Sequence, residues 1–367
     1  MKISVSKENL LRGIQAVQNA VSTKSTLPIL SHILLEAKKN EIRLTATDLE
    51  IGVSIKIDGE VAEEGAITVP ARKFSEIIKE LHPQKPIHIS VKKGQSIQID
   101  SDKSYFRLMG LLRDDFPQLP DFSSKGSDMV KIPQKTLKEM IQLTSFAMSH
   151  DETRYVLNGI LFSFKDKILK LVATDGRRLA IIEKTIEELG HFKKEVILPM
   201  KTTQELSRNL TDEGEVFFSF KENQAQIGLG PIHITSRLIE GEYPNYEQVV
   251  PKKTKEELRI NTQEFLQAAR RASILTSQDS QSVKINFIKD RMIITKNTPE
   301  VGEAREEVEV DYKGGEFVIG FNPAFLIDVL KNIEEENIHL GLTDPEKPAV
   351  IRSGKDYTYI VLPMQVT

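Results

Sequence analysis

Two aspartates stand at matching places in this sequence and are the first candidates for chemistry. Asp48 ends the run Leu44-Thr-Ala-Thr-Asp48, and Asp175 ends the run Val172-Ala-Thr-Asp175, 127 residues further along. Carboxylates at a repeated position can transfer protons or bind a metal ion. No second carboxylate accompanies both aspartates, so we interpret Asp48 and Asp175 as turn residues that follow a strand.

The other residue types that carry chemistry form no recognisable site. The absence of cysteine excludes disulfides, thiolate metal sites and cysteine nucleophiles. No phosphate-binding loop, dinucleotide fingerprint or metal-binding histidine spacing occurs. The histidines are scattered singly at His32, His82, His88, His150, His191, His233 and His339. The sequence therefore predicts a protein that is not an enzyme and has no cofactor or metal. A hydrolase that uses the two aspartates is an alternative whose remaining parts are not found.

Positive charge is concentrated in the predicted helices, although the net charge of the chain is −3. The predicted helices 7–21, 71–81, 134–148, 200–210 and 263–275 each carry one more basic than acidic residue, and 322–333 is neutral. Basic residues spread along a surface attract phosphates without reading a base sequence. A solvated helix face of mixed charge is the alternative, and the charge pattern alone leaves both open.

Ordered elements recur at one spacing along the chain, which predicts a threefold internal repeat. Leu10, Leu137 and Phe265 occupy the same position of an amphipathic helix, 127 and 128 residues apart. A strand, turn and second helix follow in the same order in each copy. Segments rich in Pro, Gly, Ser and charged residues, at 116–128 and 243–257, are typical of linkers between the copies.

Each copy predicts an α+β module of antiparallel strands with two helices on one face. The helices have a single apolar stripe at helical spacing, so each packs on something flat. Alternating apolar and polar residues predict hairpins at 87–100, 216–229 and 285–295. We place the three domains at residues 1–124, 125–252 and 253–367.

The N-terminal residues enter polar sequence without an apolar signal core. No stretch approaches the roughly 20 apolar residues that span a bilayer. The lack of cysteine fits a reducing compartment. We therefore expect a cytoplasmic protein without a membrane partner.

Short motifs occur in order along the whole chain. They are Leu27-Pro-Ile-Leu30, Ala46-Thr-Asp-Leu49, Val69-Pro-Ala-Arg-Lys-Phe74, Asp115-Phe-Pro117, Arg154-Tyr155, Leu157-Asn-Gly159, Ala173-Thr-Asp-Gly176, Arg178-Leu-Ala180, Gly241, Tyr243-Pro244 and Leu362-Pro-Met364. Together they resemble the bacterial replication sliding clamp, the β subunit of DNA polymerase III.

The resemblance implies a DNA clamp fold in which the chain is half of a head-to-tail dimeric ring around duplex DNA. Twelve helices packed roughly 10 Å apart would leave a lumen of about 28 Å, which passes a duplex. The implied partners are double-stranded DNA, a DNA polymerase, the subunits of an ATP-driven clamp loader and a second copy of the chain. The implied function is to tether the polymerase and other DNA-processing proteins, which confers processivity.

In that family, short partner peptides bind an apolar groove between the second and third domains. Aliphatic side chains and a methionine make an adaptable pocket for hydrophobic anchors. The residues at the corresponding positions are Leu157, Thr174, Gly176, Arg177, Arg178, Leu179, Pro244, Val249, Ile360, Leu362, Pro363, Met364 and Gln365. Arg177 replaces a common histidine and Gln365 a common arginine, which would alter peptide preference. Plain core packing is the alternative for the aliphatic members.

The resemblance also implies DNA-binding and dimer-forming residues. The DNA-binding set is Lys24, Arg72, Lys73, Lys138, His150, Arg154, Tyr155 and Lys201, and Val156 replaces an aromatic residue beside it. The dimer would pair residues 105–109 with residues 304–309 of another copy, with Phe106, Ile274 and Leu275 as the apolar contact. A repeat adaptor that binds only proteins is the main alternative, and its size in solution would distinguish it.

Overall fold

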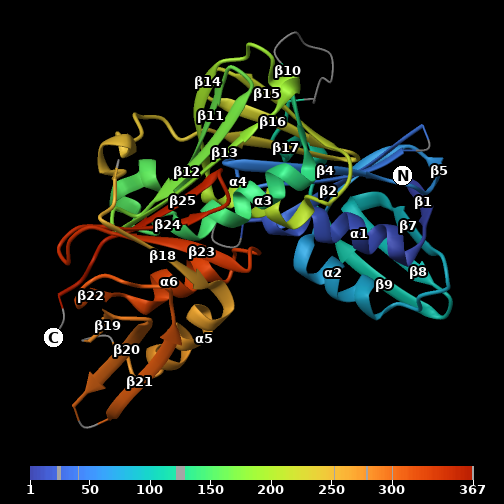
Figure 1. Cartoon of the computed structure of the whole chain (residues 1–367). Coiled ribbons are helices and arrows are strands. Elements are labelled where there is room, and N and C mark those ends of the chain that lie inside the picture. Colours follow the sequence, from blue (N-terminus) through green and yellow to red (C-terminus); the bar gives the residue numbers. More distant parts are fainter. Residues whose placement is uncertain are drawn as a thin grey trace. The chain divides into compact units, whose positions relative to one another are not determined.

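The computed structural model describes residues 1–22, 26–39, 41–120, 129–251, 253–277, 280–299 and 301–365. The chain folds into two compact units, shown in Figure 1. Residues 1–135 and 204–238 form the first unit, and residues 136–203 and 239–367 form the second. Within the described ranges, no helix is long and apolar enough to cross a membrane.

The order of helices and strands repeats three times, except that among the described elements β5 has no counterpart in the second and third modules, and this confirms the predicted internal repeat. The first module contains β1 (Lys2–Val5), α1 (Lys7–Val17), β2 (His32–Lys38), β3 (Glu41–Thr47), β4 (Ile51–Ile57), β5 (Glu60–Glu63), β6 (Gly65–Pro70), α2 (Ala71–Glu80), β7 (Ile87–Val91), β8 (Ser96–Ser101) and β9 (Ser104–Met109). The second contains β10 (Met129–Pro133), α3 (Gln134–Thr144), β11 (Gly159–Lys165), β12 (Ile168–Thr174), β13 (Arg178–Thr185), β14 (Lys194–Pro199), α4 (Met200–Asn209), β15 (Glu215–Lys221), β16 (Gln224–Leu229) and β17 (Ile232–Arg237). The third contains β18 (Glu256–Asn261), α5 (Thr262–Ser273), β19 (Val283–Ile288), β20 (Arg291–Thr298), β21 (Gly302–Glu309), β22 (Phe317–Phe321), α6 (Pro323–Leu330), β23 (Asn337–Leu342), β24 (Ala349–Ser353) and β25 (Tyr357–Val361).

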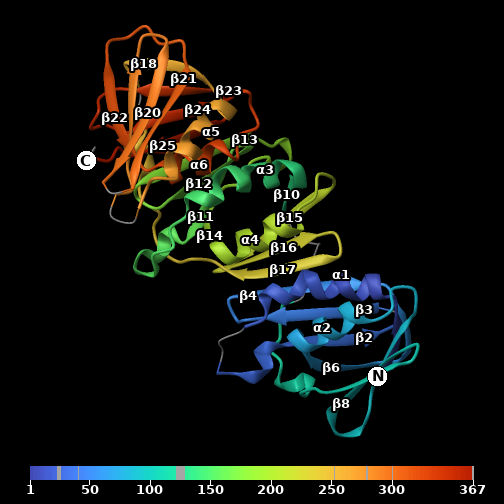
Figure 2. The ribbon, with the colours of Figure 1, turned by 90° about the horizontal axis from the view of Figure 1, so that it is seen from below.

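In the first unit, the described strands form two antiparallel sheets. The larger has the order β10-β15-β16-β17-β4-β3-β2-β6 and the smaller has the order β5-β1-β7-β8-β9. The larger sheet combines strands of the first and second modules through the pairing of β17 with β4. Figure 2 shows α1 and α2 lying against the strands of the first module.

In the second unit, the described strands again form two antiparallel sheets. Their orders are β14-β11-β12-β13-β25-β24-β23-β18 and β21-β20-β19-β22. The larger sheet joins the second and third modules through β13 and β25, with Arg178 opposite Val361 and Leu179 opposite Ile360. When the first order is followed from β10 to β6 and the second from β18 to β14, each strand of one sheet corresponds to the strand at the same position of the repeat in the other. The two larger sheets therefore have the same strand order.

Helices α1 and α5 form where an apolar stripe and a capping residue coincide. Ser6 caps α1 by accepting a hydrogen bond from the Asn9 amide, and Asn261 caps α5 by accepting from two amides in its first turn. The buried stripe of α1 includes Leu10, Ile14 and Val17, as the sequence predicts. The α-helix ends at Val17 rather than at 21, because the chain tightens into a 3₁₀ turn before β2.

The predicted hairpins are confirmed. β7 pairs with β8, β15 with β16, and β19 with β20. The strand 105–109 lies in β9, which is at the end of the five-stranded sheet, and 304–309 lies in β21, which is at the end of the four-stranded sheet. Both strands therefore present one unpaired edge within the described chain.

Acidification should destabilise the first unit through two histidines of its larger sheet. Burial lowers the pKa of His32, and burial followed by the nearby Lys56 and Arg43 lowers the pKa of His233. The unfolded chain takes up protons at the ordinary value of 6.5, whereas the folded chain resists them. This stability is therefore present above that pH and is lost as the pH falls below it.

Urea unfolding at about pH 7.5 and 5.5 checks this expectation. The midpoint urea concentration should fall between the higher and the lower pH in the natural protein. It should fall less in the double variant that carries His32→Gln and His233→Gln. An unchanged pH dependence in the double variant would contradict the assignment.

Candidate functional site

The turn between β12 and β13 is built by its own side chains. Asp175 Oδ1 accepts hydrogen bonds from the amides of Arg177 and Arg178 at 2.9 and 3.0 Å. Thr174 Oγ1 accepts from the Gly176 amide at 3.0 Å and donates to the Arg178 carbonyl at 2.5 Å. Gly176 has φ of +84°, the left-handed region that glycine adopts without strain.

The first module repeats this turn between β3 and β4. Asp48 Oδ1 accepts from the amides of Glu50 and Ile51 at 3.0 and 2.9 Å, and Thr47 Oγ1 accepts from the Leu49 amide at 3.0 Å. Leu49 has φ of +79°, as Gly176 has in the second module. Both aspartates are therefore turn residues, which confirms the sequence interpretation. Within the described residues, no group of three metal-binding side chains occurs.

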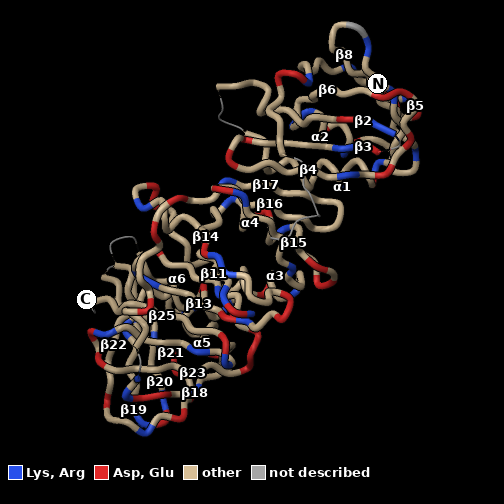
Figure 3. The backbone as a smooth tube through the Cα atoms, turned by 90° about the horizontal axis from the view of Figure 1, so that it is seen from above, with Lys and Arg blue, Asp and Glu red and all other residues tan. Residues whose placement is uncertain are grey.

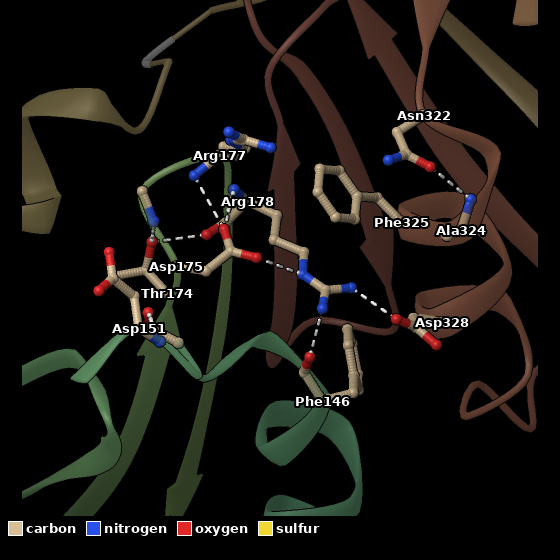
Figure 4. A network of polar contacts seen from close by, with 12 residues as sticks. Phe146, Asp151, Thr174, Asp175, Arg177, Arg178, Asn322, Ala324, Phe325 and Asp328 are labelled. Carbon is tan, nitrogen blue, oxygen red and sulfur yellow. Dashed lines mark hydrogen bonds and ion pairs between the residues drawn. The ribbon is translucent and has the colours of Figure 1, made fainter. Parts of the chain in front are cut away.

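Arg178 follows the turn, and its side chain is nearly buried, with 9% of its surface exposed. Figure 4 shows how its guanidinium reaches three partners. Nε donates to Asp175 Oδ2 at 3.0 Å, Nη1 to Asp328 Oδ2 at 2.7 Å and Nη2 to the Phe146 carbonyl at 2.6 Å. The guanidinium also lies 4.5 Å from the ring centre of Phe325. Its charge is satisfied inside the protein.

An apolar patch lies on the larger sheet of the second unit, beside this turn. Its buried members are Leu161, Val172, Leu179, Ile181, Ile197, Val350 and Ile360, and the partly buried Val156, Ile239, Tyr243, Tyr246 and Val250 pack against them. Leu179 and Ile360 belong to the predicted peptide-binding set and are paired across β13 and β25. The patch is thus formed by the second and third modules together.

The residues after β25 connect the patch to the turn. The Leu362 amide donates to the Arg177 carbonyl at 2.9 Å, and the Met364 amide donates to the Gly320 carbonyl at 2.8 Å. Leu362 and Met364 are 41% and 37% exposed, so their side chains are accessible. The Gln365 carbonyl accepts from Ser282 Oγ at 3.3 Å. These contacts bring five of the predicted peptide-binding residues, 176, 177, 362, 364 and 365, onto two neighbouring segments.

The predicted DNA-binding loop 150–155 lies against the same turn. A Cβ built on Gly176 would meet Arg154 Nη1 at 2.9 Å, and a Cβ built on Gly241 would meet Tyr155 Oη at 3.3 Å. Arg154 also pairs with Asp151 at 3.2 Å. Tyr155 is 58% exposed, and Leu157, two residues further along the chain, is buried. The structure therefore places Arg154 beside residues that the sequence assigned to peptide binding.

The other predicted residues have different surroundings. His150, Pro244 and Val249 are exposed, and Pro363 is half-buried. Arg72 and Lys73 both pair with Glu76, at 3.0 and 2.8 Å, on the exposed face of α2. Lys138 and Lys201 are half-buried on α3 and α4, and Lys24 lies outside the described residues. Figure 3 marks the basic residues along α1, α3 and α5.

The predicted dimer residues lie at exposed places. Phe106 is 37% exposed on β9, and its neighbours Tyr105 and Met109 are each 58% exposed. Ile274 is 76% exposed just after α5, and Leu275 is half-buried. Large apolar side chains at the open edge of a sheet are typical of a surface that another chain covers.

Sequence reasoning missed several members of the apolar patch. Tyr243 and Tyr246 were assigned to a linker, yet both pack against the patch. Burial raises the pKa of the Tyr243 phenol well above its ordinary value, which keeps it neutral. Two tyrosines within four residues were the available signal, because aromatic side chains bury more area than a linker requires. Val172 and Val350 carry no such signal, since any strand interior contains similar residues.

Comparison with known proteins identifies the family. Three family models match in order: the N-terminal domain of the DNA polymerase III beta subunit over residues 1–120, its central domain over 131–245 and its C-terminal domain over 247–365. A beta sliding clamp from Proteus mirabilis is 36% identical, with all of both chains covered. The chain belongs to the DNA polymerase III β subunit family, the sliding clamps.

Solved clamp structures agree with this assignment over the whole chain. A DNA polymerase III subunit beta from Pseudomonas aeruginosa has a TM-score of 0.91 at 35% identity, and a sliding clamp from the same organism bound to griselimycin has a TM-score of 0.93, also at 35% identity. Both comparisons cover all of each chain. The three-domain clamp fold predicted from the sequence is confirmed. The function is that of a sliding clamp, which confers processivity on DNA polymerase III and is not an enzyme.

Replacing Gly176 by Ala should strain the clamp at this turn. A residue with a Cβ at φ of +84° costs about 1–2 kcal/mol, and the added carbon also meets Arg154 Nη1. Gly94 is the matched control, because its φ of +73° is also in the left-handed region but nothing lies within 4 Å of an added Cβ.

Thermal unfolding of the two variants separates the cost of the backbone from the cost of the contact. We expect Gly176→Ala to lower the melting temperature more than Gly94→Ala. Equal decreases in melting temperature would show that the contact between the added Cβ and Arg154 does not contribute to the destabilisation.

Proposed function

We propose that two copies of this chain close head to tail into a ring around duplex DNA and hold DNA polymerase and clamp-loader subunits by short peptides. Family membership supports DNA and polymerase as partners. The observation that carries the peptide-binding part is an apolar patch formed jointly by two modules, with the exposed Leu362 and Met364 beside it. The domain boundaries 1–124, 125–252 and 253–367 and a cytoplasmic location remain part of the proposal.

The peptide site would work by burying hydrophobic anchors of the partner. Val172, Leu179 and Ile360 form a floor that is already ordered, so the site itself loses little entropy on binding. Met364 is unbranched and polarisable, which suits anchors of differing shape. A ligand such as griselimycin, present in the P. aeruginosa structure, would bind at this patch.

The strand order supports ring closure. β17 of the second module pairs with β4 of the first, and β25 of the third pairs with β13 of the second. In the repeat, β9 is equivalent to β17 and β25, while β21 is equivalent to β4 and β13. Pairing β9 of one copy with β21 of another would therefore join equivalent strands in the same way as the two pairings within the chain. A head-to-tail contact of this kind gives a finite ring when it closes.

Charge supports the same contact. β21 carries Glu303, Glu306, Glu307 and Glu309 with one arginine, whereas the charged residue of β9 is Arg107. Opposite charges on the two strands favour this partner and orientation over the pairing of two β21 strands. Phe106 and Ile274 would supply the apolar contact.

Retention on circular and linear DNA tests the ring. The clamp would be loaded onto nicked circular plasmid by a bacterial clamp loader with ATP, and the sample would then be split, with one half linearised, in moderately high salt. Contacts with phosphates weaken on both templates as salt rises. We expect retention on circles and loss from linear ends, with no retention when the loader is omitted. Equal loss from both templates after productive loading would contradict the ring and favour an adaptor that binds proteins only.

Sedimentation tests the proposed dimer contact. Replacing the exposed Ile274 by Asp should raise the dimer dissociation constant by at least about tenfold, because it places a charge in an apolar contact. Ile168→Asp is the control, since Ile168 is 40% exposed on β12, which is neither of the two proposed contact strands. An Ile274 variant that dimerises as well as the control would exclude this surface.

A further inference from the structure

The side chain of Arg178 is not available to a ligand in the way that its place in the predicted peptide-binding set suggests. All three of its guanidinium nitrogens donate to protein acceptors, at distances of 2.6 to 3.0 Å. Its planar group lies over the Phe325 ring and 5.7 Å from the centre of the Phe146 ring. Three of its five N–H bonds are therefore used within the protein, Phe325 covers one face of its plane, and only 9% of the side chain is exposed.

These contacts join segments that are distant in the sequence. Asp175 belongs to the β12–β13 turn, Phe146 to the 3₁₀ turn Ser145–Ala147, and Asp328 to α6. Asp328 is 150 residues from Arg178. Arg178 thus links the turn beside the apolar patch to a helix of the third module (Figure 4).

The linkage continues toward the patch through hydrogen bonds. Arg178 holds Oδ2 of Asp175, while Oδ1 of the same carboxylate accepts from the amides of Arg177 and Arg178. The Arg177 carbonyl then accepts from the Leu362 amide at 2.9 Å. Rotation of the Asp175 carboxylate would therefore disturb the turn and the segment that carries Leu362 and Met364.

We propose that Arg178 is a positioning residue, which fixes the β12–β13 turn through Asp175 and is itself held by Asp328 of α6, rather than a residue that contacts the peptide. The inference deepens the proposed function and rests on its peptide site. Asp328, although it belongs to α6, should accordingly control ligand affinity at the patch.

The test measures griselimycin binding to the full-length chain by calorimetry, at a temperature where each variant is folded by circular dichroism. Leu362→Asp first examines the site itself. The proposed peptide site, and this inference with it, would be overturned if the natural protein did not bind griselimycin. They would also be overturned if Leu362→Asp left the affinity for griselimycin unchanged.

Asp328→Asn then examines the positioning role. The substitution keeps the size of the side chain but removes the charge that Arg178 pairs with, and it should weaken binding by about tenfold. Asp328→Glu restores a carboxylate and should recover part of the affinity. Lys331→Ala is the control, because Lys331 pairs with the other oxygen of Asp328, at 2.5 Å, and does not contact Arg178; it should change affinity by less than about twofold.

A double-mutant cycle separates positioning from general destabilisation. If Arg178 and Asp328 act together, Asp328→Asn should cause little further loss of affinity in an Arg178→Lys background, because the guanidinium that pairs with Asp328 is already absent. If Arg178 instead contacts the ligand, Arg178→Lys would weaken binding while Asp328→Asn would leave it unchanged. That result would overturn the inference and leave the peptide site intact.

Discussion

The pairing of a strand from one module with a strand from the next is the interaction on which the architecture depends. β4 pairs with β17 in the first unit, and β13 pairs with β25 in the second. Without these pairings, each eight-stranded sheet would be two four-stranded sheets, one from each module, with an additional open edge on both. Open edges expose backbone groups that need hydrogen-bond partners. With them, the described strands form two eight-stranded sheets of equivalent order. The compact units consequently divide the second module rather than follow the sequence repeat.

The apolar patch is a consequence of the same pairing. Leu179 is opposite Ile360 only because β13 and β25 are in register, and Val350 reaches the patch from the neighbouring strand β24. A shift by one residue would turn these side chains to the other face of the sheet. The equivalent place in the first unit differs in character, since Gly52 and Ser54 on β4 correspond to Leu179 and Ile181 on β13. An apolar patch of this composition is therefore found on one of two sheets that share a backbone plan.

The buried guanidinium of Arg178 is compatible with stability because each charge has a nearby opposite charge or acceptor. Burying an ion pair offers little net stabilisation, but removing one partner is costly because the other charge is left in a poorly solvated place. Such a pair favours one arrangement of its neighbours over alternatives. Here the favoured arrangement is that of the β12–β13 turn, Phe146 and α6.

The sequence alone determined the repeat, the hairpins, the helical stripes and the turn role of Asp48 and Asp175, because these follow from local periodicity and from side chains that bond to nearby backbone. It also placed Leu179, Ile360 and Leu362 in one predicted site through resemblance. Only the tertiary structure revealed that Tyr243 and Tyr246 pack on the patch, that Arg154 lies against Gly176, and that Arg178 is bonded to Asp328, 150 residues away. These contacts depend on which strands pair across modules, and that choice is made by packing between distant segments rather than by the pattern within any one of them.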